Sequence, residues 1–403
     1  MSRPVFITGY GVITAVGDNA AENHSSLLRL RSGFGPLDIL DTVHRSDIYA
    51  CEIKRTDADL CKLAGVRSGF GHTRTALLAM IAAREAIDRA ALPDKDLAVA
   101  GLVSATTAGG IRELERYFYA FQDPHQAGVA LSYLDTADPG DHTERMADHF
   151  GMRSFLGTVS TACTSATNAI ILGARLIAHG VLSTVICGGA EALSKVTING
   201  FNTLMILDRN SCRPFDENRS GLNLGEGAAY LVLEAEEALQ RSGRTVIARL
   251  SGYANVNDAF HQTASSPDGT GAFQAMEKTL AWAGLRPCDI DYINAHGTGT
   301  ENNDLSEGLA IQALFGENPP SFSSTKPYTG HTTSAAGGVE AAYCLMAFEE
   351  GMIFPNLNFR EPMKELAIRP LTELVRLGGV KHILSNSLGF GGSAATLLFS
   401  KCL

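Results

Sequence analysis

A cysteine at a strand-to-helix junction is the residue of this chain whose surroundings best suit covalent chemistry. Cys163 follows the apolar, β-prone run 155–159 and precedes the apolar stretch 166–177, which ends before Gly180, so we expect the thiol between a strand and a buried helix. Unpaired N–H groups and the dipole at a helix start lower a thiol pKa, and the same N–H groups can bind an oxyanion. The sequence therefore predicts a nucleophile at residue 163, although most free cysteines are small core residues.

Three glycine-bracketed segments in the second half of the chain carry the remaining candidates. They are residues 294–300, which contain His296, residues 324–331, which contain His331, and residues 386–392. Each follows a predicted strand or precedes a helix, which is where α/β sheets place their sites. A lone histidine is more often structural, but two at such positions, together with a junction cysteine, indicate a Cys-His-His site.

The composition excludes several classes of protein. The chain has 403 residues, 45% of them hydrophobic, which is enough to bury a large core. A net charge of −10 with no run of Lys and Arg argues against nucleic acid. With no long apolar window and no signal-peptide pattern, we expect a cytoplasmic protein without a membrane segment. The eight cysteines form no CxxC pair, so neither a metal site nor a disulfide framework is expected.

The order of apolar and polar segments predicts a duplicated α/β architecture. Residues 334–351 form a small-residue, apolar, glycine-closed stretch built like the one after Cys163. Two such helices packed back to back between two sheets would explain why both are apolar all round. Residues 241–244 are typical of a linker, which divides the chain near residue 244. The aromatic, Pro- and Gly-punctuated segment 111–149 is predicted to cover a surface, to meet a partner subunit, or to form an exposed loop.

Taken in order, these motifs resemble those of a known enzyme family. The chain is similar along its full length to the β-ketoacyl-acyl-carrier-protein synthases of the type II, elongating class, which belong to the thiolase-like condensing enzymes. The motifs that carry the resemblance are ITGYGVITAVG, VSTAC, RPFD, GEGA, NAHGTGT, STK, TGH and NSLGFGG. The resemblance implies an α/β, thiolase-like five-layer αβαβα fold made of two similar halves with buried central helices. Residues 1–244 would carry the nucleophile and residues 245–403 the two histidines.

The resemblance also implies the reaction and the role of each site residue. The enzyme would be an acyltransferase of fatty-acid elongation that condenses malonyl-ACP, with loss of CO2, with an acyl group on a cysteine to give 3-oxoacyl-ACP. No cofactor is expected, because phosphopantetheine arrives on the carrier protein. The implied residues are the acyl-accepting Cys163, the decarboxylation histidines His296 and His331, and the orienting charged pair Lys326 and Glu340. The implied oxyanion hole is the backbone N–H groups of Cys163 and Phe390, with Phe390 also a gate, and the implied substrate-binding residues are Thr298, Thr300, Ala108, Gly389 and Gly391.

The family's partners set further expectations. The chain would bind acyl- and malonyl-loaded acyl carrier protein, and would form a homodimer, or a heterodimer with a related synthase-like subunit, through the edge strand 155–159. Carrier proteins of this family are acidic while this chain is itself at −10, so a basic patch should surround the site entrance. Its candidates are Arg67, Arg74, Arg209 and Arg213.

Some residues depart from the family's pattern and leave alternatives open. Ser334 stands where glycine is usual, Ser393-Ala394 where Thr-Asn is common, and residues 164–168 read Thr-Ser-Ala-Thr-Asn. A ketosynthase of a specialised polyketide or polyene pathway is therefore an alternative to fatty-acid elongation. A chain-length-factor-like partner would lack the nucleophile, and Cys163 argues against it. A cysteine hydrolase would leave the second histidine without a role.

Overall fold

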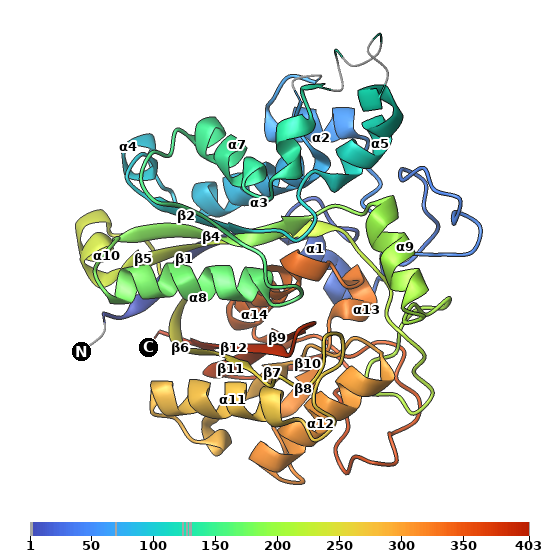
Figure 1. The fold of residues 1–403 in the computed structure, drawn as a ribbon. Helices are drawn as coiled ribbons and strands as arrows, with labels where there is room; N and C mark the ends of the chain where they lie inside the picture. Colours follow the sequence, from blue (N-terminus) through green and yellow to red (C-terminus); the bar gives the residue numbers. More distant parts are fainter. Residues whose placement is uncertain (1–2, 69–70, 123–124, 126–127, 129–130, 403) are drawn as a thin grey trace.

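The computed structural model describes residues 3–68, 71–122, 125, 128 and 131–402, which fold into five layers of helices and sheets. Figure 1 shows helices above an upper sheet, two helices in the middle, a lower sheet, and helices below it. The upper strands are β1 (Val5–Thr14), β2 (Gly101–Ala105), β3 (Leu156–Val159), β4 (Thr184–Glu191) and β5 (Gly227–Ala235). The lower strands are β6 (Ala248–Asn257), β7 (Tyr292–Asn294), β8 (Ser321–Ser323), β11 (His382–Gly389) and β12 (Ser393–Ser400). This confirms the predicted thiolase-like αβαβα architecture.

The helices fill the other three layers. The central pair is α8 (Ser165–Ala178) and α14 (Ala336–Glu350), and the helices below are α11 (Thr270–Ala283) and α12 (Glu301–Phe315). The helices above are α2 (Asp57–Ala64), α3 (Arg74–Arg89), α5 (Ile111–Gln122) and α7 (Asp141–Phe150). The remaining elements are α1 (Ala20–Leu28), α4 (Asp94–Leu97), α9 (Lys195–Thr203), α10 (Glu236–Ser242), α13 (Lys326–Thr329), β9 (Met352–Ile353), β10 (Val375–Arg376) and the 3₁₀ turns Leu134–Ala137, Pro287–Asp289 and Thr333–Ala335.

The strand order reveals the duplication that the sequence suggested. The upper strands lie in the order β3-β2-β4-β5-β1, and the lower strands in the order β8-β7-β11-β12-β6. Each half therefore arranges its third, second, fourth, fifth and first strand in the same sequence. The two sheets meet where Val5–Ile7 of β1 pair with Ala248–Leu250 of β6. Because the halves correspond strand by strand, the loops that follow equivalent strands open toward the same region between the halves.

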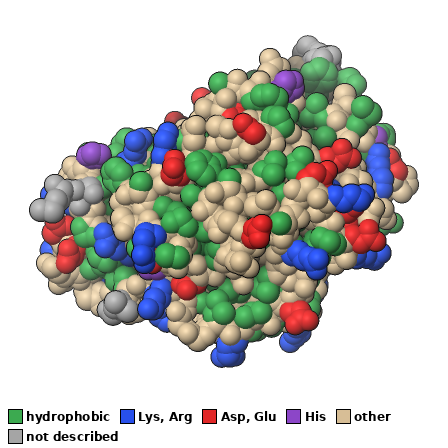
Figure 2. Space-filling model, turned by 90° about the horizontal axis from the view of Figure 1, so that it is seen from below, with side chains coloured by type: hydrophobic (Ala, Val, Ile, Leu, Met, Phe, Trp, Pro, Cys, Tyr) green, Lys and Arg blue, Asp and Glu red, His purple; other side chains and the backbone are tan. Residues whose placement is uncertain are grey.

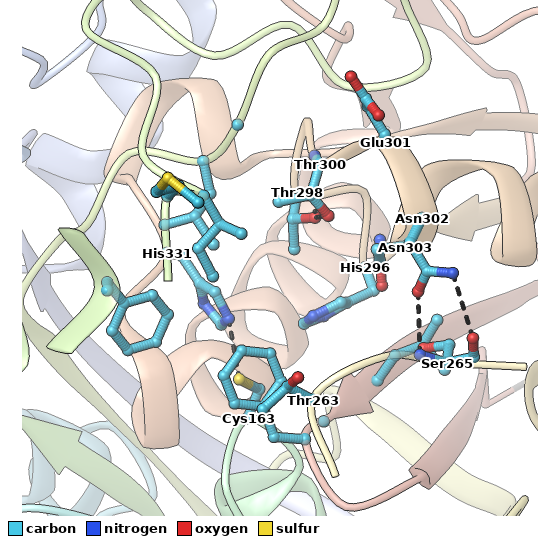
Figure 3. Close-up of a pocket in the computed structure, with 18 of the residues that line it drawn as sticks. Cys163, Thr263, Ser265, His296, Thr298, Thr300, Glu301, Asn302, Asn303 and His331 are labelled. Atoms are coloured by element: carbon cyan, nitrogen blue, oxygen red, sulfur yellow. Dashed lines mark hydrogen bonds between the residues drawn. The ribbon is translucent and has the colours of Figure 1, made fainter. Parts of the chain in front are cut away.

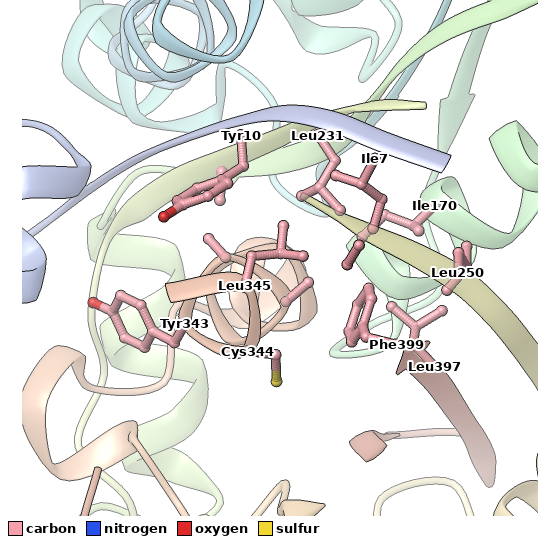
Figure 4. Close-up of a cluster of buried hydrophobic side chains, with 14 of the residues drawn as sticks. Ile7, Tyr10, Ile170, Leu231, Leu250, Tyr343, Cys344, Leu345, Leu397 and Phe399 are labelled. Carbon is pink, nitrogen blue, oxygen red and sulfur yellow. The ribbon is translucent and has the colours of Figure 1, made fainter. Parts of the chain in front are cut away.

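The central helices form the core that joins the halves. All residues of α14 from Ala336 to Phe348 are buried, and α8 packs against both α14 and strands of the two sheets. Figure 4 shows Leu345 of α14 between Leu231 of the upper sheet and Phe399 of the lower one. A helix enclosed by two sheets has little polar surface to present, which explains why α14 is mostly apolar and why α8 is polar only at a few positions such as the exposed Arg175.

The segment 111–149 is mostly helical where it is described, so it is not simply an exposed loop. Helix α5, the turn at Leu134–Ala137 and α7 account for most of it, and its residues 123–124, 126–127 and 129–130 lie outside the described part of the chain. Phe118 and Tyr119 of α5 are 54% and 81% exposed. This exposed aromatic face agrees with a segment that covers a surface or meets a partner, and that role stays a prediction.

The surface is mixed in charge, and its helices are short. On the face seen in Figure 2, acidic and basic side chains are interspersed among apolar ones. Within the described residues, no helix is both long and apolar enough to cross a membrane.

The predicted division of the chain near residue 244 coincides with the end of α10. Gly243 caps this helix in a left-handed conformation, and the domain boundary itself stays a prediction.

Arg74 is wrong as a carrier-protein contact, because its side chain is fully buried. It begins α3, with Nη2 2.7 Å from Oε1 of Glu226 and Nη1 2.9 Å from Oδ1 of Asp57. The same guanidinium also donates to the carbonyl oxygens of Arg55 and Ile53. All of its donors therefore serve the packing of the N-terminal half.

Glu113 generates a prediction on stability, because its buried carboxyl group is only half satisfied. Its Oε1 accepts from the Arg74 backbone N–H at 2.9 Å, while Oε2 has no hydrogen-bond partner within the described residues. Burial raises the pKa of Glu113 to about 7. Its stabilising contribution is therefore complete below the unfolded-state pKa, roughly 4, and is lost as the pH rises through about 7. At about 1.4 kcal/mol per pKa unit, the ionised form costs the fold roughly 3 kcal/mol.

We expect Glu113→Gln to raise the melting temperature at pH 8 and to leave it nearly unchanged at pH 5, where the wild-type carboxyl is neutral. Thermal melts of both proteins between pH 5 and 8 measure this. A variant that melts lower than the wild type at pH 8 would contradict the assignment of an unfavourable buried charge.

Candidate active site

The cysteine lies in a tight, strained turn between β3 and α8. Ala162 has a left-handed backbone with φ +53°, which costs a non-glycine residue about 1–3 kcal/mol. Ser165 holds this turn, because its Oγ donates to the Ala162 carbonyl at 2.6 Å and accepts from the Thr161 N–H at 2.8 Å. Cys163 is 6% exposed and precedes the first helical residue by two positions. The predicted strand-to-helix junction is confirmed.

The thiol and both histidines meet at the bottom of one cavity (Figure 3). The Cys163 sulfur is 3.0 Å from Nε2 of His331, and the rings of His331 and His296 lie 5.2 Å apart at 83° to each other. Three segments that are far apart in the sequence are joined here, since the loops after β3, β7 and β8 open to the same place. The two histidines and the thiol form the constellation that the motifs predicted.

Lys326 connects His296 to Glu340 through a fully buried ammonium group. Its Nζ donates to the His296 carbonyl oxygen at 2.6 Å, to Nδ1 of His296 at 3.1 Å, and to Oε1 of Glu340. An ammonium can only donate, so Nδ1 of His296 accepts and the ring proton lies on Nε2, on the cavity side. The charged pair therefore fixes the tautomer of His296.

His331 is not restrained in the same way. Its Nδ1 is buried without a hydrogen-bond partner within the described residues, while Nε2 faces the sulfur. Burial, followed by the charge of Lys326, lowers the pKa of both histidines well below the usual range. Both imidazoles are thus neutral near pH 7, and His331 can accept or donate a proton at Nε2.

The thiol pKa differs from the sequence-based expectation of a lowered value. Burial raises the pKa of Cys163 to about 11, although Lys326 and the backbone N–H groups of Phe390 and Cys163 itself lower it. Desolvation of a thiolate at the buried Cys163 position exceeds the effect of a helix start that lies two residues away. The resting group is a neutral thiol hydrogen-bonded to His331. The two N–H groups that act on the sulfur are those expected to form the oxyanion hole.

Two buried carboxylates that the sequence analysis missed hold the His296 loop in shape. Glu307 accepts from the N–H groups of His296 and Gly297, both at 2.8 Å, and Asp304 accepts from Thr298 at 2.9 Å and from Phe215 at 2.7 Å. The sequence signal that could have revealed them is their spacing of three residues in the first two turns of α12, directly after a glycine-rich loop. They position the histidine without touching the cavity.

The cavity has a volume of about 330 Å³ and two chemically different walls. Hydroxyl and amide groups line one side, and apolar side chains line the other. The polar wall contains Thr263, Ser265, Thr298, Thr300 and Asn302, and the apolar wall contains Phe201, Met205, Ile206, Leu222 and Leu388. A ligand that is polar along its length but carries an apolar or reactive end would match both walls.

The remaining predicted site residues divide between the cavity and its surroundings. Thr298, Thr300, Gly389 and Phe390 line the cavity, and the ring of Phe390 stacks on Phe201 with centroids 5.9 Å apart. Ala108 and Gly391 are not among its lining residues. The Ala108 N–H instead donates to Glu191, which also accepts from Ser334 at 2.6 Å. The Gly391 N–H donates to the Gln262 carbonyl oxygen at 2.8 Å, a contact that lies outside the cavity lining.

The distances alone would also suit a cation. The donor atoms of Cys163, His296 and His331 lie within 4.8 Å of one another, and such an N2S set is typical of zinc. A metal ligand must offer a lone pair, however, and the Lys326 contact leaves the cavity-facing nitrogen of His296 protonated. The arrangement favours hydrogen-bond donation to an anionic oxygen over metal binding.

Comparison with known proteins gives a consistent result. The family model described as "Beta-ketoacyl synthase, N-terminal domain" matches residues 2–238, and that described as "Beta-ketoacyl synthase, C-terminal domain" matches residues 247–360. The chain is 31% identical over 410 residues to the 3-oxoacyl-[acyl-carrier-protein] synthase 2 of Staphylococcus aureus (strain N315), covering 99% of each.

Two solved structures are also similar to this one. The ishigamide ketosynthase/chain length factor matches with a TM-score of 0.92 and 30% identity over 100% of both chains. The ketosynthase ApeO in complex with its chain length factor ApeC, from Xenorhabdus doucetiae, matches with a TM-score of 0.84 and 29% identity, covering 99% of this chain and 98% of that one.

The raised thiol pKa leads to a prediction on reactivity. We expect the rate of Cys163 alkylation by iodoacetamide to increase about tenfold per pH unit from pH 6.5 to 9.5 without a plateau, because only the thiolate reacts. Peptide mass spectrometry after timed quenching measures the modification at Cys163 separately from that at the exposed Cys288 and Cys402. A rate that is already constant near pH 7 would show a preformed thiolate–imidazolium pair instead.

Proposed function

Because the chain belongs to the β-ketoacyl synthase family, we propose that it is a condensing enzyme that extends a carrier-bound acyl chain by a decarboxylative Claisen reaction. The observation that carries the proposal is the contact of the Cys163 thiol with His331 in a cavity that also holds His296 with a fixed tautomer. The proposed product is a 3-oxoacyl-ACP, and the proposed pathway is fatty-acid elongation.

In the first half-reaction, the enzyme takes up an acyl group. The Cys163 proton passes to Nε2 of His331 as the sulfur attacks the thioester carbonyl of acyl-ACP. The carbonyl oxygen becomes anionic and accepts from the N–H groups of Cys163 and Phe390. The C–S bond to the carrier's pantetheine thiol then breaks, and that thiolate takes the proton from His331. An acyl-cysteine and a free carrier thiol result, and His331 is neutral again.

In the second half-reaction, a malonyl thioester replaces the first carrier. Loss of CO2 leaves its electron pair in an enolate, whose oxygen accepts from Nε2–H of His296 and Nε2–H of His331. The first half-reaction leaves the ring proton of His331 on Nδ1. Because that Nδ1 has no hydrogen-bond partner within the described residues, the proton can shift to Nε2, from which His331 donates here. The enolate carbon forms the new C–C bond with the acyl carbon, and the C–S bond to Cys163 breaks. The Cys163 thiolate then takes up one proton, which the overall reaction consumes from solvent, and 3-oxoacyl-ACP leaves.

The reactive groups would reach the thiol on the carrier's phosphopantetheine arm, so no resident cofactor is proposed. Hydroxyl groups of Thr298 and Thr300, 2.9 Å apart on the polar wall, suit the amides of such an arm. The proposal is supported by the name of the Staphylococcus aureus relative, which specifies an acyl-carrier protein. Three candidates for carrier docking stay in the proposal: Arg67 and Arg209, both exposed, and the half-buried Arg213.

A ketosynthase of a polyketide or polyene pathway is the second candidate. It is favoured by the likeness to the ishigamide ketosynthase/chain length factor, whose TM-score is 0.92. The chemistry at Cys163 would be the same, and the acyl group and carrier would differ. Incubation with a panel of acyl-carrier proteins, followed by intact-protein mass spectrometry, separates the two by which acyl groups load.

Substitution of the nucleophile tests the reaction class. We expect Cys163→Ala to abolish condensation with little change in melting temperature, because the lost side chain is small. Cys163→Gln should also abolish condensation but retain decarboxylation of malonyl-ACP, since its planar amide resembles the acylated thiol while His296 and His331 remain. Product formation and CO2 release are measured side by side. Normal condensation by either variant would rule out Cys163 as the nucleophile.

The edge position of β3 leads to a prediction on assembly. Among the described strands, β3 pairs only with β2, and Leu156 is 41% exposed. An uncovered edge strand invites pairing with another chain, and a two-fold axis beside β3 would join two upper sheets. We expect a dimer of the 42.8 kDa chain with an interface above about 2,000 Å². Light scattering at micromolar concentration tests this, and a monodisperse monomer would contradict it.

A further inference from the structure

The loop that carries Phe390 is the turn of a hairpin whose stem is fixed next to the nucleophile. Strands β11 and β12 are joined by residues 390–392, and Gly389 pairs with Ser393 at the closing position. Gly391 and Gly392 have φ +83° and +78°, conformations that suit glycine. The position of the Phe390 N–H therefore depends on where the stem is anchored.

Both sides of this stem contact the turn around Cys163. On one side, a Cβ added to Gly389 would lie 3.2 Å from the Cys163 nitrogen and 3.3 Å from the Thr164 nitrogen, so the two backbones pack directly. On the other side, Oγ of Ser393 lies 2.9 Å from Oγ1 of Thr164. The Ser393 contact joins the residue next to the nucleophile to the residue that closes the hairpin.

The direction of this hydrogen bond follows from the other contacts of Thr164. Its hydroxyl donates to the Thr161 carbonyl at 2.7 Å, so Ser393 must be the donor to Thr164. Asn168 donates to the hydroxyl oxygens of Thr161 at 2.9 Å and of Thr164 at 3.2 Å, and accepts from Asn255 of β6 at 2.6 Å. Thr164 is fully buried and its hydroxyl is fully hydrogen-bonded, while its partners Ser393 and Thr161 are half-buried and exposed, respectively.

We propose that Thr164 and Ser393 are positioning residues that hold the Phe390 backbone N–H at the carbonyl oxygen of a thioester attacked by Cys163. The inference rests on the proposed function and specifies how this chain builds its oxyanion hole. The hole needs two N–H groups from different halves of the protein, one on the turn before α8 and one on the β11–β12 hairpin. The Thr164–Ser393 hydrogen bond spans that division within one residue of the nucleophile.

The consequence is kinetic, because an oxyanion donor contributes only when it lies within hydrogen-bond reach of the developing charge. Removing one donor outright costs about 10²–10³ in rate. Loosening the hairpin displaces the donor without deleting it, so we expect a smaller loss of about tenfold. The rate of acyl transfer should decrease while the affinity for the carrier stays the same, since neither Thr164 nor Ser393 lines the cavity.

The experiment compares two reactions of the same sulfur in the full-length protein. Thr164→Val removes the hydroxyl with little change in volume, and Ser393→Ala removes its partner. Single-turnover acylation of Cys163 by octanoyl-ACP should slow about tenfold in each variant and by no more in the double variant. Alkylation by iodoacetamide at the same pH should slow much less than acylation, because displacement of iodide forms no oxyanion and the Phe390 N–H affects it only through the thiol pKa. Thr164→Ser keeps the hydroxyl and should restore acylation.

A matched control is available one turn further along the same helix. Oγ1 of Thr167 lies 2.7 Å from Oγ of Ser387, which is a second hydroxyl pair between α8 and the β11–β12 hairpin, away from its turn. Thr167→Val should lower the melting temperature about as much as Thr164→Val while acylation proceeds at the wild-type rate. The control thus separates loss of a hydrogen bond from loss of oxyanion positioning.

Three results would overturn the proposal. If the wild type is acylated and Thr164→Val is acylated equally fast, this inference fails while the proposed function stands. If acylation and alkylation slow by the same factor, the pair supports the thiol and not the oxyanion hole. If the wild type takes up no acyl group from any carrier, the proposed function fails and this inference with it.

Discussion

One buried ammonium group sets the protonation pattern of the whole site. Lys326 has three donors, and it uses them on the carbonyl and Nδ1 of His296 and on Glu340. Because His296 cannot then carry its ring proton on Nδ1, its Nε2–H points into the cavity before any substrate arrives. His331, whose Nδ1 is unpartnered within the described residues, has no such restraint. One histidine is therefore a permanent donor and the other can exchange roles between the half-reactions.

The site buries several charged side chains, which is unfavourable unless each has a hydrogen-bonding or ionic partner. Burial raises the pKa of Glu340 to about 7, and Lys326 opposes this shift by stabilising the carboxylate, whose Oε2 has no hydrogen-bond partner within the described residues. Glu307 and Asp304 are also buried, and each accepts several backbone N–H groups from the loops around His296. Such a site is preorganised, because its donors do not have to reorient when charge develops in the substrate. Rigidity comes from the central helices, which are enclosed by both sheets.

Much of the fold, and the residues that the structure brings together around Cys163, could be predicted from the sequence, for physical reasons that differ by element. The α8 and α14 segments are apolar on nearly every side, which a central position explains, and the glycine-bracketed histidines mark strand ends. The thiol pKa was predicted with the wrong sign, because a helix start is visible in a sequence while complete burial is not. Arg74 was misplaced for the same reason, since its partner Glu226 lies 152 residues away.

The parts that could not be predicted depend on contacts between distant segments. The tautomer of His296 requires Lys326 at 3.1 Å, and the anchoring of the Phe390 hairpin requires Ser393 beside Thr164, 229 residues apart. Neither contact produces a periodic or local pattern in the sequence. Ala108 and Gly391 came from the family's pattern, and their placement outside the cavity lining reflects how single loops fold in this chain.

The most direct test of this account is neutron diffraction from a deuterium-exchanged crystal of the substrate-free enzyme near pH 7. The predicted nuclear density shows deuterium on Nε2 of His296, none on its Nδ1, and three deuterons on Lys326 directed at the His296 carbonyl, Nδ1 and Glu340. It should also show the Cys163 deuteron directed at His331. Deuterium on Nδ1 of His296 would contradict the claim that Lys326 presets this histidine as a hydrogen-bond donor to the substrate.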